Sequence, residues 1–284
     1  MTTPGDALTY VYAAAPLTTG LRDALMGLRG IYGSPVLLVT APPGTGGPAP
    51  PVAFATSHVP RRDFNESALK SHFEDLEWLE DVARAHHDVV QALSIHAPVL
   101  PLRMATVYQD DDRAGQALAE QQDAFAERLA QLTAHTEFGV KIYLAPTAAP
   151  AGTGPLPDTD ASAATTPGKA YLQRRRAQHN AQEAVYSQAQ EAAGIIATVA
   201  SQYASQHVRH PTQRGTLTGP VENVLNDAYL VPDAYAEPFR AAIERAVGVF
   251  DGIRVEVTGP WAPYSFAAPP VEGRHSAPGE EHGS

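Results

Sequence analysis

Cysteine is absent from this 284-residue sequence, which excludes disulfides, thiolate metal sites and thiol nucleophiles. Basic residues are also few: Lys and Arg total 20 against 31 Asp and Glu, so the net charge is -11. Nucleic acids and anionic membranes are bound by clustered positive charge, and we therefore expect neither as a partner. Long apolar runs are missing as well, since no segment approaches the ~20 residues of a membrane span.

The composition is otherwise that of a folded protein. Charged residues make up 18% of the chain and hydrophobic residues 44%. A chain of 284 residues is long enough for two domains, each with its own core. The first residues, MTTPGDALTYVYAAAP, have neither the basic start nor the apolar run of a secretory signal, so we expect a soluble, cytoplasmic protein.

No grouping of residues predicts a metal or cofactor site. His86 and His87 lie beside Glu80 and Asp81, which invites a metal proposal. Adjacent residues on a helix point about 100° apart, however, and these spacings match no zinc signature. A partly buried structural histidine is the better interpretation of His86.

Two further patterns favour structural roles. The run Asp110–Asp112 precedes a helical segment and predicts N-terminal capping, because it lacks the alternating ligands of a calcium loop. The cluster Gly44, Gly46 and Gly47 predicts a turn, because no Lys-Ser/Thr follows as in a phosphate-binding loop. No Ser-His-Asp grouping stands out either. We therefore expect no catalytic residues, no cofactor and no enzymatic activity.

The first half of the chain alternates strand-like and helix-like segments. Extended segments are predicted at 8–13, 35–40, 52–56 and 98–108. Helical periodicity is found at 18–28, 65–95 and 111–133. This order predicts an N-terminal domain over residues 1–136, a modified ferredoxin-like domain with an extra helix.

The second half repeats the order. Extended segments are predicted at 137–144, 207–210, 222–230 and 252–258, and helices at 168–205 and 232–249. We predict a ferredoxin-like domain over 137–266, with a flexible loop at 145–166 and a disordered tail at 267–284. The fold class is thus α+β, with two ferredoxin-like (β-α-β-β-α-β) domains and long amphipathic helices. At about 1.5 Å per residue the 168–205 helix is about 55 Å long, so part of it should project.

Two segments are candidates for contacts with a partner. Arg174, Arg175 and Arg176 cannot all be buried on one helix, so they form either a solvated face or a contact for an anionic partner surface. Trp261, Tyr264 and Phe266 lie in a Pro-punctuated extended segment. They either seal a domain edge or form an exposed aromatic anchor.

Six blocks along the chain resemble the gas vesicle protein F/L family in sequence and in order. These are LEWLEDVARAHHDVV, APVLPLRMATVY, EFGVKIYL, GKAYLQRR, NDAYLVP and TGPWAPYSF. The resemblance extends from about Tyr10 to Phe266, and only the loops and the tail fall outside it. The proline-rich loops are longer than the family pattern predicts, and the blocks do not separate the F from the L subfamily.

The resemblance implies a minor, non-enzymatic component of the gas vesicle, an air-filled protein shell that gives microbes buoyancy. It implies a protein that binds the small, very hydrophobic shell protein and other gas vesicle accessory proteins. Such a component would assist nucleation and assembly and keep the shell protein from aggregating. It also implies a two-domain fold with ferredoxin-like modules, in agreement with the pattern of segments.

One alternative from another functional class remains. Ferredoxin-like domains often bind metabolites, so the chain is also compatible with a small-molecule-binding regulatory module. A hydrolase is the least favoured interpretation, because it requires a deep pocket with strongly perturbed ionisable groups.

Overall fold

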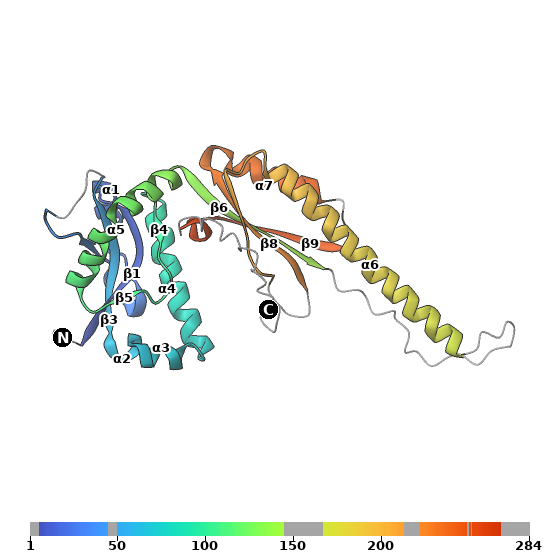
Figure 1. Ribbon diagram of the computed structural model, residues 1–284, viewed down its shortest axis with the longest axis horizontal. Helices are drawn as coiled ribbons and strands as arrows, with labels where there is room; N and C mark the ends of the chain where they lie inside the picture. Colours follow the sequence, from blue (N-terminus) through green and yellow to red (C-terminus); the bar gives the residue numbers. More distant parts are fainter. Residues whose placement is uncertain are drawn as a thin grey trace, which may run out of the picture. The chain divides into compact units, whose positions relative to one another are not determined.

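The computed structural model describes residues 6–44, 50–144, 167–212, 222–248, 250 and 252–267, apart from the side chains of 167–170 and 174. The predicted loop 145–166, Gly46 and Gly47, and residues 268–284 of the predicted tail lie outside this part of the chain. The described residues form two compact units, 6–134 with 262–267 and 135–261. Figure 1 shows the chain coloured along its sequence.

The first unit is built on one antiparallel sheet. Its strands are β1 (Ala7–Pro16), β2 (Leu37–Thr40), β3 (Val52–Pro60), β4 (Leu100–Pro101) and β5 (Val107–Tyr108). The order is β2-β3-β1-β4, and β5 also pairs with β1. The inner residues of β1 are all buried, which means that both faces of the sheet are covered.

Helices cover both faces of this sheet (Figure 1). They are α1 (Thr19–Ala24), α2 (Arg61–Phe64), α3 (Glu66–His72), α4 (Leu76–Ser94) and α5 (Asp111–Leu132), with a 3-10 turn at Ile31–Gly33. On one face, α4 brings His86 against Tyr10 of β1. On the other face, Phe125 of α5 packs edge-on against Phe54 of β3, with ring centroids 5.6 Å apart. The predicted extra helix, α5, therefore packs on the face opposite α4.

The predicted helix over 65–95 is wrong as a single element. This segment forms two helices instead, α3 and α4, because a polar side chain caps the start of each. Asn65 accepts a hydrogen bond from the Ala68 amide, and Asp75 accepts from the amides of Glu77 and Trp78. The capping role predicted for the acidic run is confirmed, since Asp110 accepts from the Arg113 amide at the start of α5.

The predicted extended segment over 98–108 is also interrupted. Only β4 and β5 pair with the sheet, and Ala105 between them has a left-handed φ of 63°. The Ala105 amide donates to the hydroxyl of Tyr10, at 3.1 Å. The turn is therefore held by a buried side chain of β1 rather than by a ladder of strand hydrogen bonds.

The C-terminal described segment belongs to the first unit. Phe266, in the 3-10 turn Tyr264–Phe266, is 2% exposed. Its carbonyl oxygen accepts a hydrogen bond from Nε of the buried Arg128, at 2.7 Å. The Ala262 amide donates to Oε1 of Gln91, at 2.6 Å. Residues 262–266, which the sequence places at the end of the second domain, thus pack with α4 and α5.

The second unit has the predicted β-α-β-β-α-β order. Its strands are β6 (His135–Leu144), β7 (Gln206–Arg209), β8 (Asn223–Pro232) and β9 (Ile253–Trp261). Its helices are α6 (Pro167–Ala200) and α7 (Ala236–Val247), and a 3-10 turn spans Asp233–Tyr235. The sheet is antiparallel with the order β7-β8-β6-β9. This places β7 and β9 at the two edges.

The core of the second unit lies between this sheet and its two helices (Figure 1). Alternate residues of β6, including Phe138 and Ile142, are buried in one cluster with Ile196 of α6 and Phe239 of α7. Small residues of α6 in the same cluster let the helix approach the sheet closely. These are Ala189, Ala192 and Ala200.

Only the second half of α6 takes part in this core. Every described side chain from 171 to 184 is exposed, and burial begins at Val185. The projection that the length of the helix predicts is therefore confirmed. The first 18 residues of α6, 167–184, extend beyond the sheet for about 27 Å at 1.5 Å per residue.

Candidate functional site

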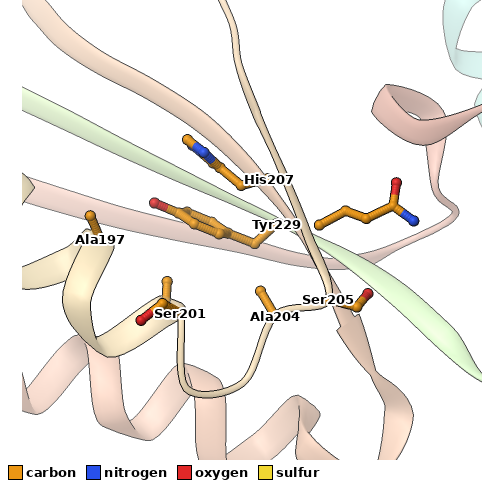
Figure 2. Close-up of a pocket in the computed structure, with 8 residues that line it drawn as sticks. Ala197, Ser201, Ala204, Ser205, His207 and Tyr229 are labelled. Carbon is orange, nitrogen blue, oxygen red and sulfur yellow. The ribbon is translucent and has the colours of Figure 1, made fainter. Parts of the chain in front are cut away.

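A pocket of about 250 Å³ lies where the C-terminal end of α6 meets the edge strand β7. Figure 2 shows small side chains on one side of it and the rings of His207 and Tyr229 on the other. The pocket is lined by Ala197, Ala200, Ser201, Ala204, Ser205, Gln206, His207 and Tyr229. Because Ala and Ser side chains are short, they leave room for an inserted side chain.

The pocket follows from the way α6 ends. The helix stops at Ala200, and the Ala204 amide donates back to the Ala200 carbonyl at 2.9 Å. The Ser205 amide then donates to the Leu230 carbonyl of β8 at 2.8 Å, which starts the β7–β8 pairing. A turn of only a few residues thus holds the end of the helix beside the edge of the sheet.

The outer edge of β7 carries backbone groups that the sheet does not use. The His210 amide donates to the Asn226 carbonyl at 2.8 Å, which fixes the phase of the antiparallel ladder. In such a ladder alternate residues direct both N–H and C=O away from the neighbouring strand. In this register those residues are His207 and Arg209. Within the described part of the chain, β7 pairs with β8 alone.

A buried carboxylate fixes the side chains of this edge strand. Asp227 of β8 has a side chain that is 2% exposed. Its Oδ1 accepts from Nε of Arg209 at 2.9 Å, and its Oδ2 lies 3.0 Å from Nε2 of His207. A buried carboxylate needs such partners, since an unpaired charge is costly to desolvate. The side chains of His207 and Arg209 are therefore both held on the side of the sheet that faces α6.

These contacts shift the pKa values of Asp227 and Tyr229. Burial raises the pKa of Asp227, but hydrogen bonds and charge from Arg209 and His207 outweigh it and hold the pKa below its ordinary value. Burial, together with the charge of Asp227, raises the pKa of Tyr229. The Tyr229 ring stacks on His207 with centroids 4.8 Å apart. This wall of the pocket is thus a neutral phenol stacked on an imidazole that contacts Asp227.

Sequence analysis missed this cluster. Its signal is present in the block NDAYLVP, where Asp227 occupies the same strand phase as the buried Leu225, Tyr229 and Val231. When an acidic residue alternates with buried apolar residues along a strand, its side chain is expected to have a buried partner. The partners themselves are set by the β7–β8 register, which the short segment around 207–210 does not specify.

The predicted contact residues are distributed over both units. Arg175 and Arg176 are exposed on the projecting half of α6, whereas the side chain of Arg174 is outside the described part. Trp261 is 39% exposed at the end of β9. Phe266 is buried and Tyr264 packs against the core of the first unit, so both seal this core. Burial removes Phe266 from the candidate contact surface.

A second cavity, of about 390 Å³, lies in the first unit beside α4. It is lined by Ala83, His86, His87, Leu102, Arg103, Met104 and Tyr264. His86 is 4% exposed, and its Nδ1 lies 2.9 Å from the Tyr10 hydroxyl. Burial, with a smaller contribution from His87, lowers the pKa of His86 to about 4. At neutral pH the imidazole of His86 is therefore uncharged.

Within the residues that the structure describes, no three His, Asp or Glu side chains come together as metal ligands would. In the same part of the chain, no helix is long and apolar enough to cross a membrane.

Comparison with known proteins identifies relatives over almost the whole chain. A family model described as "Gas vesicle synthesis protein GvpL/GvpF" matches residues 8–268. Gas vesicle protein L of Streptomyces sp. (strain CB03234) is 36% identical over 271 residues, which cover 95% of this chain and 96% of that protein.

Two solved structures share the fold. Crystal structures of gas vesicle protein GvpF from Anabaena sp. PCC7120 and Microcystis aeruginosa match with a TM-score of 0.59 each, at 16% and 17% identity. Both matches cover 92% of this chain, and 96% and 99% of the respective GvpF chains. The mixed helix-and-sheet architecture with two antiparallel sheets, the α+β class expected from the sequence, is confirmed.

Proposed function

The chain belongs to the GvpL/GvpF family of gas vesicle synthesis proteins, and from this premise we propose that it is a non-enzymatic assembly component of the gas vesicle. It binds the hydrophobic shell protein, prevents its aggregation and assists nucleation of the vesicle, together with other gas vesicle accessory proteins. It acts in the cytoplasm before assembly and at the vesicle afterwards. The open edge of β7 beside a small-residue pocket carries this proposal.

The edge of β7 suits an apolar partner that is prone to self-association. An extended segment can add to an exposed strand through backbone hydrogen bonds, and a neighbouring pocket then selects one side chain. Here the backbone groups are those of His207 and Arg209, and the pocket is lined by Ala197 and Ala204. Covering an aggregation-prone strand in this way removes the template on which further copies would assemble.

The rest of the surface agrees with this function. A protein that shields an apolar partner must remain charged elsewhere, so that the complex does not itself aggregate. The net charge of -11 provides this repulsion. The predicted contact residues Arg175, Arg176 and Trp261 remain proposals for additional contacts.

Filling the pocket tests the proposal. Ala197 is exposed and lines the pocket, so Ala197→Phe occupies the space without altering β7. Thr198→Phe is the matched control, because its neighbouring position on the same helix is also exposed and lies outside the pocket lining. On co-expression we expect the wild-type chain and Thr198→Phe to raise the soluble yield of the shell protein. Ala197→Phe should reduce this gain at least tenfold.

Two results would overturn this function. A wild-type chain that neither binds the shell protein nor changes its yield would remove the proposed activity altogether. Equal gains from Ala197→Phe and Thr198→Phe would exclude the pocket at β7 as the binding site.

The cavity beside α4 favours one other function, a small-molecule-binding regulatory module. Its volume of about 390 Å³ falls within the range of ligand pockets, about 300–1,000 Å³. A neutral His86 together with Tyr264 would suit a small ligand with an apolar or aromatic body. A ligand-dependent rise in melting temperature that is lost in His86→Phe would support this function over the first.

A further inference from the structure

The projecting half of α6 is a basic segment of an acidic protein. Residues 167–184, here called the basic arm, contain four Lys or Arg residues and one Glu, a net charge of +3. The whole chain has a net charge of -11. The Glu183 carboxylate lies 3.5 Å from His179 on the same helix.

The basic arm also exposes apolar side chains. Tyr171 is 59% exposed and Leu172 is 57% exposed. Residues four apart lie on the same face of a helix, so Tyr171 neighbours Arg175, and Leu172 neighbours Arg176. A helical segment without tertiary packing is only marginally stable in water. The arm therefore presents a paired apolar and cationic surface that its own unit does not cover.

A surface of opposite charge lies where α3 meets α4. Residues 73–81, FEDLEWLED, here called the acidic elbow, hold five acidic residues and no basic one. Phe73 is 49% exposed and Leu76 is 69% exposed. Two of the five carboxylates have local partners, since Asp75 caps α4 and Glu80 pairs with Arg84. Glu74, Glu77 and Asp81 are exposed.

We propose that the basic arm of one copy of this chain docks on the acidic elbow of a second copy. Both surfaces combine two large exposed apolar side chains with several charges, and the charges are opposite in sign. Such complementarity speeds encounter and fixes the register of association. Each copy carries both surfaces, so the basic arm of each copy can bind the acidic elbow of the other, as in a closed two-fold dimer.

Salt dependence and charge reversal provide the test. Exposed ion pairs are screened as ionic strength rises, so self-association should weaken at least tenfold between about 0.05 M and 0.5 M salt. Sedimentation of the full chain measures this directly. We expect Arg175→Glu with Arg176→Glu, or Glu77→Lys with Asp81→Lys, to weaken self-association at least tenfold. All four substitutions in one chain should restore it.

Controls separate docking from folding and from net charge. Arg22→Glu with Arg29→Glu changes the net charge by the same amount as Arg175→Glu with Arg176→Glu. These positions are exposed and lie outside both surfaces, so association should be unchanged. The restored association of the fourfold variant shows that the paired variants fold.

Three outcomes would overturn the proposal. A wild-type chain that stays monomeric at all concentrations would overturn it. A fourfold variant that fails to associate while it melts like the wild type would also do so. So would a dimer that the paired reversals leave unchanged.

Discussion

Arg209 donates a hydrogen bond to each carboxylate oxygen of Asp227, from Nε to Oδ1 at 2.9 Å and from Nη2 to Oδ2 at 3.0 Å. The two residues face each other across β7 and β8. The carboxylate is 2% exposed, whereas the Arg209 side chain is 64% exposed. A four-residue edge strand gains little from its own apolar area, so this pair provides much of its attachment to the sheet.

Asp227→Asn should destabilise the second unit by about 2 kcal/mol at pH 7, because it removes charged hydrogen bonds from a buried site. The pKa of Asp227 is lowered on folding, so its contribution is present above about pH 4 and is lost as pH falls through the folded value. Urea unfolding at pH 7 and pH 3 measures both effects. The exposed Asp233→Asn is the control and should change little. A pH-independent difference between wild type and Asp227→Asn would contradict the assignment.

His86 should make the first unit sensitive to mild acid. Its pKa is lowered to about 4 in the folded state, against about 6.5 when unfolded. Between these values the unfolded chain binds more protons, so stability falls as pH falls from 6.5 to 4. The loss should be about 3 kcal/mol.

The variant His86→Gln tests this origin. Gln keeps a polar group near the Tyr10 hydroxyl but does not titrate in this range. Melting temperatures followed from pH 7 to pH 4 should therefore fall less steeply than for the wild type. Parallel curves for the two proteins would show that another group is responsible.

The C-terminal block should contribute to stability through Phe266 rather than Trp261. Phe266 is 2% exposed, and Phe266→Ala should destabilise the first unit by about 3 kcal/mol through loss of buried area. Trp261 is 39% exposed, and Trp261→Ala should cost less than about 1 kcal/mol. Chemical denaturation of both variants gives the comparison. A larger loss for Trp261→Ala would reverse the roles assigned to the two aromatic residues.

The fold was predictable wherever local pattern and tertiary packing agree. The helix predicted at 111–133 is α5, because its N-terminal cap, Asp110, directly precedes the segment and its apolar stripe lies within it. The family resemblance based on six ordered blocks is confirmed by the family match over residues 8–268. The domain boundaries at 136 and 266 remain predictions, although the described units divide at 134 and 261.

The remaining features depend on contacts distant in sequence. Asn65 and Asp75 have the polarity of an exposed helical face, and only their side-chain hydrogen bonds divide the predicted helix into two. The candidate site was missed for a similar reason. It exists because the β7–β8 register brings Arg209 opposite Asp227, about which periodicity along the chain carries no information.

Backbone amide hydrogen exchange of β7, with and without the shell protein, tests the central claim most directly. In the free chain the amides of His207 and Arg209 point to the open edge and should exchange fast, whereas the His210 amide is bonded to Asn226 and should exchange slowly. We predict that the shell protein slows exchange at His207 and Arg209 at least tenfold. Complex formation that leaves both amides exchanging as fast as before would contradict the claim.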